Sequence, residues 1–406
     1  MHNFYEFFAG GGMARAGLYK SGKWNCLFAN DIDEKKAASY RANWSRVPWR
    51  DHMVVDDVAM LKPEQLIERG HADLAWASFP CQDLSLAGAG AGLSGERSGA
   101  FLPFWDLISA LHDQSYAPKL VVLENVVGAL TAGKGEDFVT LGTMLATGGY
   151  RFGAVVINAE HWVPQSRPRL FIIAVHKSMR INEELVSDGS PSPWHTSALV
   201  AAHGRLLKRL ETTGDQDSWI WWNLSEPPAT RLTYQSLADV IEPGDPTGVT
   251  WHTKAETERL TKELMNEHNK KKVKTHQEKA DETGKRVVGT VYKRMRPEGP
   301  VIGIDENGKD IHQKVQRAEV RFDNVAGCLR TPSGGSSRQT ILILEPNVPP
   351  RSRLLSTREA ARLMGLDDRY ELPEKYNDAY HLAGDGVAVD VVHFLSEHIL
   401  EPLLEI

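Results

Sequence analysis

Four side chains that could take part in one reaction stand next to short apolar runs of this sequence. Cys81 and Glu124 each follow such a run, and Arg167 and Arg169 come just before another. A thiolate is a nucleophile, a carboxylic acid can donate a proton, and guanidinium groups stabilise negative charge that develops in a transition state. Each has a structural alternative, because a cysteine is most often a small buried hydrophobe and an arginine can simply pair with a carboxylate. A fold that brings all four together would favour catalysis.

The apolar runs predict such a fold. They alternate with amphipathic stretches such as Glu34–Trp44 and Phe101–His112. This alternation predicts an α/β protein with an open, mostly parallel sheet covered on both faces, and ligands of such sheets bind beyond the carboxyl ends of the strands. The four side chains would meet at that edge. The predicted strands are Phe4–Phe8, Cys26–Ala29, Met53–Val55, Leu74–Ala77, Leu120–Leu123, Ala154–Ile157 and Leu170–Val175.

A glycine-rich turn and two aspartates follow the first three predicted strands. The first strand ends in Phe8-Ala9-Gly10-Gly11-Gly12-Met13, and a helix through about Tyr19 comes next. Glycines at such a turn let the backbone approach a ligand and aim helix N–H groups at a negative group, although the segment could be only a tight turn. Asp31 and Asp57 could accept hydrogen bonds from ribose hydroxyls or, alternatively, cap helices. Together these features favour an adenosine-containing ligand.

Six short segments occur along the chain in a particular order. They are Phe8-Ala9-Gly10, Pro80-Cys81-Gln82, Glu124-Asn125-Val126, Gln165-x-Arg167-x-Arg169, Arg358–Gly365 and Ala383–Val389. In this order they resemble the motifs of the DNA cytosine-5 methyltransferase family, and the resemblance covers about residues 4–176 and 350–406. It implies a Rossmann-like, mostly parallel seven-stranded sheet with a second, smaller DNA-recognition domain. It also implies methyl transfer from S-adenosylmethionine to carbon 5 of a flipped cytosine in a specific duplex sequence, with S-adenosylhomocysteine as product and no metal.

The resemblance also assigns roles to the four side chains. Cys81, followed in its motif by Gln82, is the nucleophile that adds to carbon 6 of cytosine, which turns the ring into an enamine whose carbon 5 can attack the methyl sulfonium. Glu124 donates to N3, and Arg169 lies near O2, where electron density accumulates. Arg167 orients the site or holds a phosphate. The target base must leave the duplex stack to reach these groups.

Two positions depart from the family's pattern at the expected cofactor site. Ile32 stands where members often carry an aromatic residue that stacks on adenine, so we expect an aliphatic contact there. Asp385 stands where many members have asparagine. Because a carboxylate would repel the carboxylate of S-adenosylmethionine, we expect Asp385 to point into backbone N–H groups. The residues expected at the cofactor are Phe8, Ala9, Gly10, Gly12, Met13, Asp31, Ile32, Asp57, Val58, Pro80, Asp385, Gly386 and Val387.

Three parts of the chain are expected: a catalytic domain over 1–176, a target recognition domain over 177–349 and a returning segment over 350–406. The middle part contains the lysine-rich stretch Lys254–Lys285, which could face phosphates or form a solvated helix face. The glycine-rich stretch Gln82–Gly99 has a composition suited to a mobile lid or to an ordinary loop. The residues expected to contact DNA are Ser85, Arg97, Gln165, Arg330, Ser333, Gly334, Gly335 and Arg338.

Composition limits the function classes further. The formal net charge of −6 argues against a protein that coats nucleic acid indiscriminately, and the three distant cysteines fit no disulfide or zinc spacing. No apolar run of about 18 residues offers a membrane span, so we expect a cytoplasmic protein. Double-stranded DNA is the expected partner, a cognate restriction endonuclease is possible, and a monomer is the default expectation. The alternatives are an RNA cytosine-5 methyltransferase and an inactive DNA-binding protein.

Overall fold

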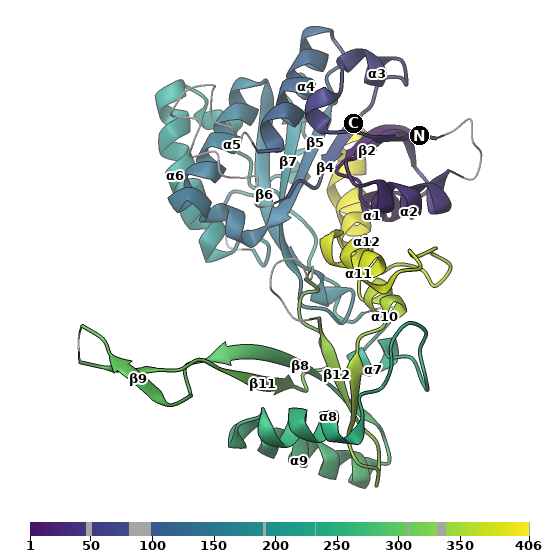
Figure 1. Ribbon diagram of the computed structural model, residues 1–406. Helices are drawn as coiled ribbons and strands as arrows, with labels where there is room; N and C mark the ends of the chain where they lie inside the picture. The colour runs from purple at the N-terminus through teal and green to yellow at the C-terminus, as the bar shows by residue number, and fades with distance from the viewer. Residues whose placement is uncertain are drawn as a thin grey trace.

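The computed structural model describes residues 1–45, 51–80, 99–189, 192–231, 233–306, 308–330 and 338–405. These residues form a large α/β unit and a smaller lobe, and both chain ends lie on the large unit (Figure 1). In the described part of the chain, no helix combines the length and the apolar character needed to cross a bilayer.

A seven-stranded sheet forms the centre of the large unit. The strands follow the order β3-β2-β1-β4-β5-β7-β6, and β7 is antiparallel to both of its neighbours while the other pairs are parallel. This mostly parallel α/β sheet confirms the predicted fold class. The strands are β1 His2–Phe7, β2 Trp24–Asp31, β3 Met53–Val55, β4 Leu74–Ala77, β5 Leu120–Val126, β6 Tyr150–Asn158 and β7 Pro168–His176.

Helices cover both faces of this sheet. One hydrophobic core joins the sheet to α1 and α12 through Leu18 and Val392, and a second joins the other face to α4, α5 and α6 through residues such as Leu107, Leu145 and Leu206. The two chain ends therefore share one core (Figure 1). The helices of the large unit and of its junction with the smaller lobe are α1 Met13–Tyr19, α2 Glu34–Trp44, α3 Pro63–Ile67, α4 Phe101–Asp113, α5 Glu136–Thr147, α6 Ser197–Thr213, α10 Thr357–Arg362, α11 Tyr376–Asp385, α12 Val389–Leu395 and α13 Glu401–Leu404.

The smaller lobe is built on a four-stranded antiparallel sheet of order β11-β8-β12-β13. One face of this sheet packs against α9 through Val291, Val320 and Leu342, and the other face joins the core of the large unit through Val288 and Ile341. A hairpin of β9 and β10 extends away from the lobe (Figure 1). The elements are α7 Leu237–Val240, α8 Lys254–Glu258, a π-helical turn η10 Arg259–Glu263, α9 Glu267–Thr283, β8 Val287–Arg296, β9 Val301–Ile304, β10 Asp310–His312, β11 Val315–Arg321, β12 Thr340–Leu344 and β13 Arg351–Leu354.

Candidate active site

An acid and an arginine meet at the carboxyl end of β5. In the antiparallel β5–β7 pair, Glu124 lies opposite Phe171 and Val126 lies opposite Arg169. The Nε of Arg169 is 3.1 Å from Oε1 of Glu124, and the two side chains are only 13% and 7% exposed. The predicted run stopped at Leu123, but β5 continues through Glu124 and Asn125. The sheet itself thus places the acid beside the cation.

Burial gives Glu124 the properties of a proton donor. Removal from solvent raises the pKa of the Glu124 carboxyl, and Arg169, Arg167 and a hydrogen bond from Ser78 limit that rise. Ser78 in turn accepts a 3.0 Å hydrogen bond from the indole N–H of Trp76 in β4. A carboxyl that keeps its proton to higher pH than an exposed glutamate is better suited to donate it to a ring nitrogen.

Arg167 holds the segment around Leu329 to the C-terminal end of α11 rather than facing solvent. Its side chain is 1% exposed, and its guanidinium donates to the carbonyls of Leu329 at 3.2 Å, Gly384 at 2.7 Å and Gly386 at 2.5 Å. Such burial leaves no access for a DNA phosphate, and these contacts are to backbone carbonyls rather than to a carboxylate. The alternative that Arg167 orients the site is the one that the geometry favours.

Gln165 was predicted to contact DNA, and this is wrong. The residue is fully buried, with its amide donating to the Leu363 carbonyl at 2.7 Å and its oxygen accepting from the Leu329 N–H at 3.0 Å. It fastens the segment before β7 to the segment after α10. A buried amide with partners on both sides cannot read a base, and its distant partners gave no local signal in the sequence.

Asn125 fixes the segment that leads towards Cys81. Its side-chain amide donates to the Phe79 carbonyl at 3.0 Å. Pro80, the next residue, is exposed at the end of β4. Cys81, Gln82, Ser85, Arg97 and the rest of the glycine-rich stretch through residue 98 lie outside the described residues, as do Ser333, Gly334 and Gly335.

Cys328 is a thiol at this site that sequence reasoning missed. Its sulfur lies 3.3 Å from Nη1 of Arg167 and 3.8 Å from Nη2 of Arg169. Burial alone would raise the pKa of the thiol, but Arg167, Arg169 and Arg330 outweigh burial and lower it. Cys328 and Arg167 are 161 positions apart, so only the fold reveals the contact. The sulfur acts as a hydrogen-bond acceptor for both arginines.

The glycine turn after β1 divides into an open part and a packed part. Gly10 has φ +54°, and nothing lies within 4 Å of the place where a Cβ would stand. At Gly12, with φ +79°, a Cβ would collide with the Trp44 indole, so this glycine is required by the packing of α2. The Met13 side chain is 2% exposed and lies against Gly386. Gly10 is therefore the glycine of the turn that is free to approach a ligand.

Asp31 supports this turn. One carboxylate oxygen accepts a 2.7 Å hydrogen bond from the Gly10 N–H, and the other accepts one of 2.8 Å from the Asp33 N–H. The neighbouring Ile32 is 69% exposed at the end of β2, which leaves an apolar face available to a planar ring. Phe8, with φ +54°, and Ala9 complete the approach to the turn.

The other predicted cofactor residues lie on nearby segments. Asp57 caps a short 3-10 helix, because its carboxylate accepts a 2.9 Å hydrogen bond from the Ala59 N–H. Helix capping was the alternative to a ribose contact that the sequence left open for this residue. Val58 and Val387 are buried.

Asp385 was expected to point into backbone N–H groups, and this is wrong. Its carboxylate instead lies 2.7 Å from Nζ of Lys36 on α2. Burial would lower the pKa of Lys36, but Asp385 and Asp31 outweigh burial and raise it, so the ammonium stays charged. Because the two residues are 349 positions apart, the pairing has no sequence signature. The repulsion expected from Asp385 is thus met by a counter-ion.

Two arginines bracket the segment predicted to touch DNA. Arg330 is exposed, whereas Arg338 donates to Asn377 and stacks 5.4 Å from the centre of the Tyr376 ring. Arg338 is therefore held against α11, and Arg330 is the one with access to a phosphate. The lysine-rich helix α9 packs on the sheet face that looks away from the large unit. The solvated-face alternative fits its lysines better than a role in the catalytic cleft.

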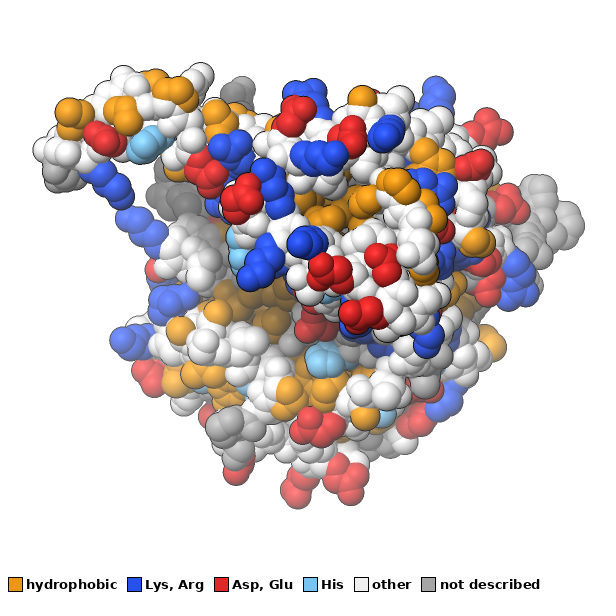
Figure 2. Space-filling model, turned by 90° about the horizontal axis from the view of Figure 1, so that it is seen from below, with side chains coloured by type: hydrophobic (Ala, Val, Ile, Leu, Met, Phe, Trp, Pro, Cys, Tyr) orange, Lys and Arg blue, Asp and Glu red, His pale blue; other side chains and the backbone are white. Residues whose placement is uncertain are grey.

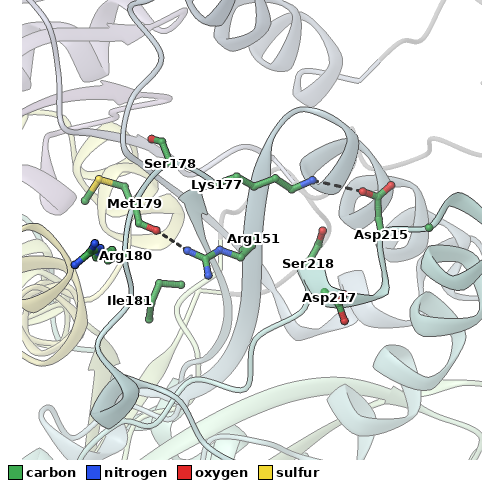
Figure 3. Close-up of a pocket in the computed structure, with 10 residues that line it drawn as sticks. Arg151, Lys177, Ser178, Met179, Arg180, Ile181, Asp215, Asp217 and Ser218 are labelled. Atoms are coloured by element: carbon green, nitrogen blue, oxygen red, sulfur yellow. Dashed lines mark hydrogen bonds and ion pairs between the residues drawn. The ribbon is translucent and has the colours of Figure 1, made fainter.

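A hollow of about 680 Å³ lies elsewhere on the large unit (Figure 3). It adjoins the start of β6 and the end of β7, which is the opposite end of the sheet from Glu124. There Arg151 donates to the Met179 carbonyl at 2.6 Å, and Lys177 lies 3.4 Å from Asp215. Both cations have partners, and ligands of such sheets bind beyond the carboxyl edge. This hollow is not the active site.

The sheet, the open glycine turn and the acid–arginine pair define a Rossmann-like α/β methyltransferase. The chain belongs to the family of C-5 cytosine-specific DNA methylases, whose family model matches residues 2–401. The resemblance seen in the six segments is thereby confirmed over nearly the whole chain.

Several bacterial proteins resemble the chain along most of its length. The type II methyltransferase M.HpaII of Haemophilus parainfluenzae is 24% identical over 405 residues, which cover 98% of this chain and 89% of the relative. The type II methyltransferase M.BanI of Aneurinibacillus aneurinilyticus is 25% identical, with 99% and 95% covered. The chain thus matches type II methyltransferases over most of their own length.

Solved structures share the fold. An Entamoeba histolytica methyltransferase, EhMeth, matches with a TM-score of 0.59 at 13% identity, covering 100% of this chain and 98% of that one. A putative DNA modification methyltransferase from an Escherichia coli prophage matches with a TM-score of 0.54 at 17% identity, covering 100% and 99%. At these identities the likeness concerns the fold alone.

Proposed function

We propose that the protein transfers a methyl group from S-adenosylmethionine to carbon 5 of a cytosine in duplex DNA, through a covalent bond between Cys81 and carbon 6. The observation that supports this most is the buried Glu124–Arg169 pair at the carboxyl edge of the sheet. Ser78, which hydrogen-bonds to Glu124, lies three positions before the proposed nucleophile in the chain. Family membership supports the same reaction.

The proposed steps use the chain's own groups in sequence. The Cys81 thiolate adds to carbon 6 of the flipped cytosine, while Glu124 donates its proton to N3 and Arg169 faces O2. The electron pair now available at carbon 5 forms a bond to the methyl carbon, while the bond from that carbon to the donor sulfur breaks and its electrons stay on sulfur, which leaves S-adenosylhomocysteine. A base then removes the proton from carbon 5, and the carbon 6–sulfur bond breaks, which restores the thiolate. N3 returns its proton to Glu124, which restores both the neutral aromatic ring and the acid. Arg167 keeps Arg169 in place through the Cys328 sulfur that both arginines contact.

The methyl donor supplies an electrophilic methyl group on a sulfonium, and several residues suit its parts. Gly10 offers an open backbone, and Ile32 offers an exposed apolar face for adenine. Asp31 already accepts the Gly10 N–H, and its remaining lone pairs suit ribose hydroxyls. Asp385, Gly386 and Val387, carried by the loop that Arg167 holds, suit the amino-acid end.

Trapping tests the covalent step directly. Duplex DNA that contains 5-fluorocytosine is expected to form a complex with the protein and S-adenosylmethionine that survives denaturation, because fluorine cannot leave carbon 5 as a proton does. Denaturing electrophoresis and mass spectrometry would detect it. Duplexes with ordinary cytosine serve as the control. If no covalent complex forms while the duplex is bound, the proposed mechanism is wrong.

The Lys36–Asp385 pair gives a second prediction, at the cofactor. Lys36→Met is expected to weaken binding of S-adenosylhomocysteine about three- to fivefold, because Asp385 then faces the carboxylate of the ligand without a counter-ion; a partly exposed pair is worth up to about 1 kcal/mol. Adding Asp385→Asn to the same chain should restore the affinity. Titration calorimetry measures both values. A double variant that binds as weakly as Lys36→Met would contradict the repulsion argument.

Type II modification of one DNA sequence is the biological role that we propose, with a cognate endonuclease as a separate partner. The matched type II methyltransferases support it. Methylation-sensitive sequencing of DNA from cells that express the protein would reveal the modified word. A parallel assay with transfer RNA tests the RNA alternative, and methylation of RNA but not of duplex DNA would exclude the proposed substrate.

A further inference from the structure

The β-ribbon arm of the smaller lobe, residues 293–317, carries an unusual share of exposed apolar side chains. Eleven large hydrophobic residues are exposed in the described part of the chain, and five of them lie on this arm. Exposed apolar groups gathered on one element mark an interaction site more often than a solvated surface. The five are Met295, Val301, Ile302, Ile304 and Ile311, with exposed fractions of 43–67%.

We call the outer part of this arm, residues 301–312, the arm tip. Both faces of the arm tip are uncovered. Ile304 pairs with Asp310 and Gly303 pairs with Ile311 across the two strands. Side chains alternate along a strand, so Ile302 and Ile304 share one face while Ile311 lies on the other. Figures 1 and 2 show the arm standing clear of the rest of the molecule. A lone two-stranded ribbon is marginally stable in water, so this one fits a role in which a partner covers it.

The charge of the arm tip disfavours DNA as that partner. The tip carries Asp305, Glu306 and Asp310 against Lys309, which gives a net charge of −2. Phosphates would repel this charge, since affinity for the DNA backbone comes from cations that displace its counter-ions. A surface that is apolar and edged with cations would complement the tip.

The same chain offers such a surface. A groove of about 490 Å³ lies between the segment of α8 and η10 on one side and α9 on the other, with Val273, Pro349 and Pro350 in its lining. Four lysines and two glutamates also line it, for a net charge of +2; they are Lys254, Lys262, Lys270, Lys274, Glu258 and Glu278. We call it the lysine groove. It lies with α9, on the sheet face away from the large unit, so the catalytic cleft does not account for it.

We propose that the arm tip of one copy of this chain occupies the lysine groove of a second copy. The isoleucines would contact the prolines and Val273, and the acids of the tip would face the lysines of the rim. The arm extends away from its own lobe, so the tip is presented to another molecule (Figure 1). Exchange in both directions around a two-fold axis closes a dimer with two identical contacts.

This dimer replaces the monomer expected from the sequence. The monomer was expected because one flipped base needs only one active site. In the proposed dimer each copy keeps its own active site, because α9 packs on the face of the smaller sheet that is turned away from the large unit. The proposal does not depend on the methylation chemistry. Its test measures mass rather than activity.

Sedimentation velocity of the full chain tests the contact. Wild-type protein is expected to sediment as a dimer at micromolar concentration, and Ile302→Ser with Ile304→Ser should raise the dimer dissociation constant at least about 100-fold, because four apolar contacts are lost per dimer. Val200→Ser is the matched control, since Val200 is 50% exposed on α6, far from both surfaces in sequence. It should leave the dimer unchanged. Circular dichroism would verify that every variant is folded.

Mixing two variants makes the test specific. Lys262→Glu with Lys270→Glu should also give a monomer, because the groove then repels the tip. When this groove variant is mixed with the tip variant at high concentration, a heterodimer weaker than the wild-type dimer should appear, since one of its two contacts keeps an intact tip in an intact groove. A wild-type monomer at every concentration would overturn the proposal. The proposal would also be overturned if neither variant changed the dimer dissociation constant, or if the mixture of the two variants stayed monomeric. A tip variant that lost DNA affinity but still formed the dimer would overturn it as well.

Discussion

Replacing Cys81 with serine is expected to abolish methyl transfer while leaving DNA binding largely intact. A serine hydroxyl is ionised far less than a thiol at neutral pH and cannot add to carbon 6, so carbon 5 never becomes nucleophilic. The methyl group then stays on its donor. Transfer of tritiated methyl groups to duplex DNA measures the loss, and a gel-shift titration of the same duplex measures binding.

The control for this prediction is another thiol of the same chain. Cys26 is fully buried in β2, near the Tyr40 hydroxyl, and burial raises its pKa to about 11. Cys26→Ala should therefore keep turnover, although it can lower the melting temperature by leaving a small cavity. Appreciable turnover by Cys81→Ser would contradict the assignment of Cys81 as nucleophile. Loss of DNA binding by the same variant would contradict the expectation that the thiol is needed for the chemistry and not for binding.

The large sheet could be predicted because its strands are apolar runs of the right length. Each of the seven predicted strands is present, and β3 and β4 have the predicted bounds. The other bounds differ, and in β5 the strand continues past the predicted end at Leu123 through the buried Glu124. A carboxylate usually marks the end of a strand in a sequence. Here Arg169 compensates its charge, and that partner comes from a different strand.

The residues of the site were predictable only as far as motifs fix them. Glu124 and Arg169 come together as the resemblance implied. The roles of Gln165 and Asp385 depend on partners far away in the chain, and composition cannot place Leu363 or Lys36 beside them. The sequence also left open whether the lysine-rich stretch faces phosphates or forms a solvated helix face. Its charge is real, but the burial of Val273 and Ala280 turns α9 onto the far face of the smaller sheet.

Replacing Glu124 with glutamine is expected to lower the methylation rate by about 10²–10⁴-fold, the usual contribution of a positioned general acid. The amide keeps the shape and can still donate a hydrogen bond to N3, but it cannot give up a proton as electron density reaches that nitrogen. The decrease in methylation rate therefore measures the contribution of proton donation separately from that of the hydrogen bond to N3. Single-turnover methylation of a duplex substrate measures the chemical step without interference from product release.

The pH dependence gives this prediction a second readout. Wild-type activity should rise as the Cys81 thiolate forms and then fall as Glu124 loses its proton, and the fall should come at higher pH than for an exposed glutamate because burial raises the pKa of Glu124. Glu124→Gln should remove the fall but keep the rise. Glu124→Gln is preferable to Glu124→Ala because the glutamine can still accept a hydrogen bond from Arg169. Alanine would leave the nearly buried Arg169 guanidinium without its partner, and the pH profile would no longer report on Glu124 alone. A variant with the wild-type rate and an unchanged pH profile would exclude Glu124 as the acid, and the donor at N3 would then have to come from another residue at this edge of the sheet.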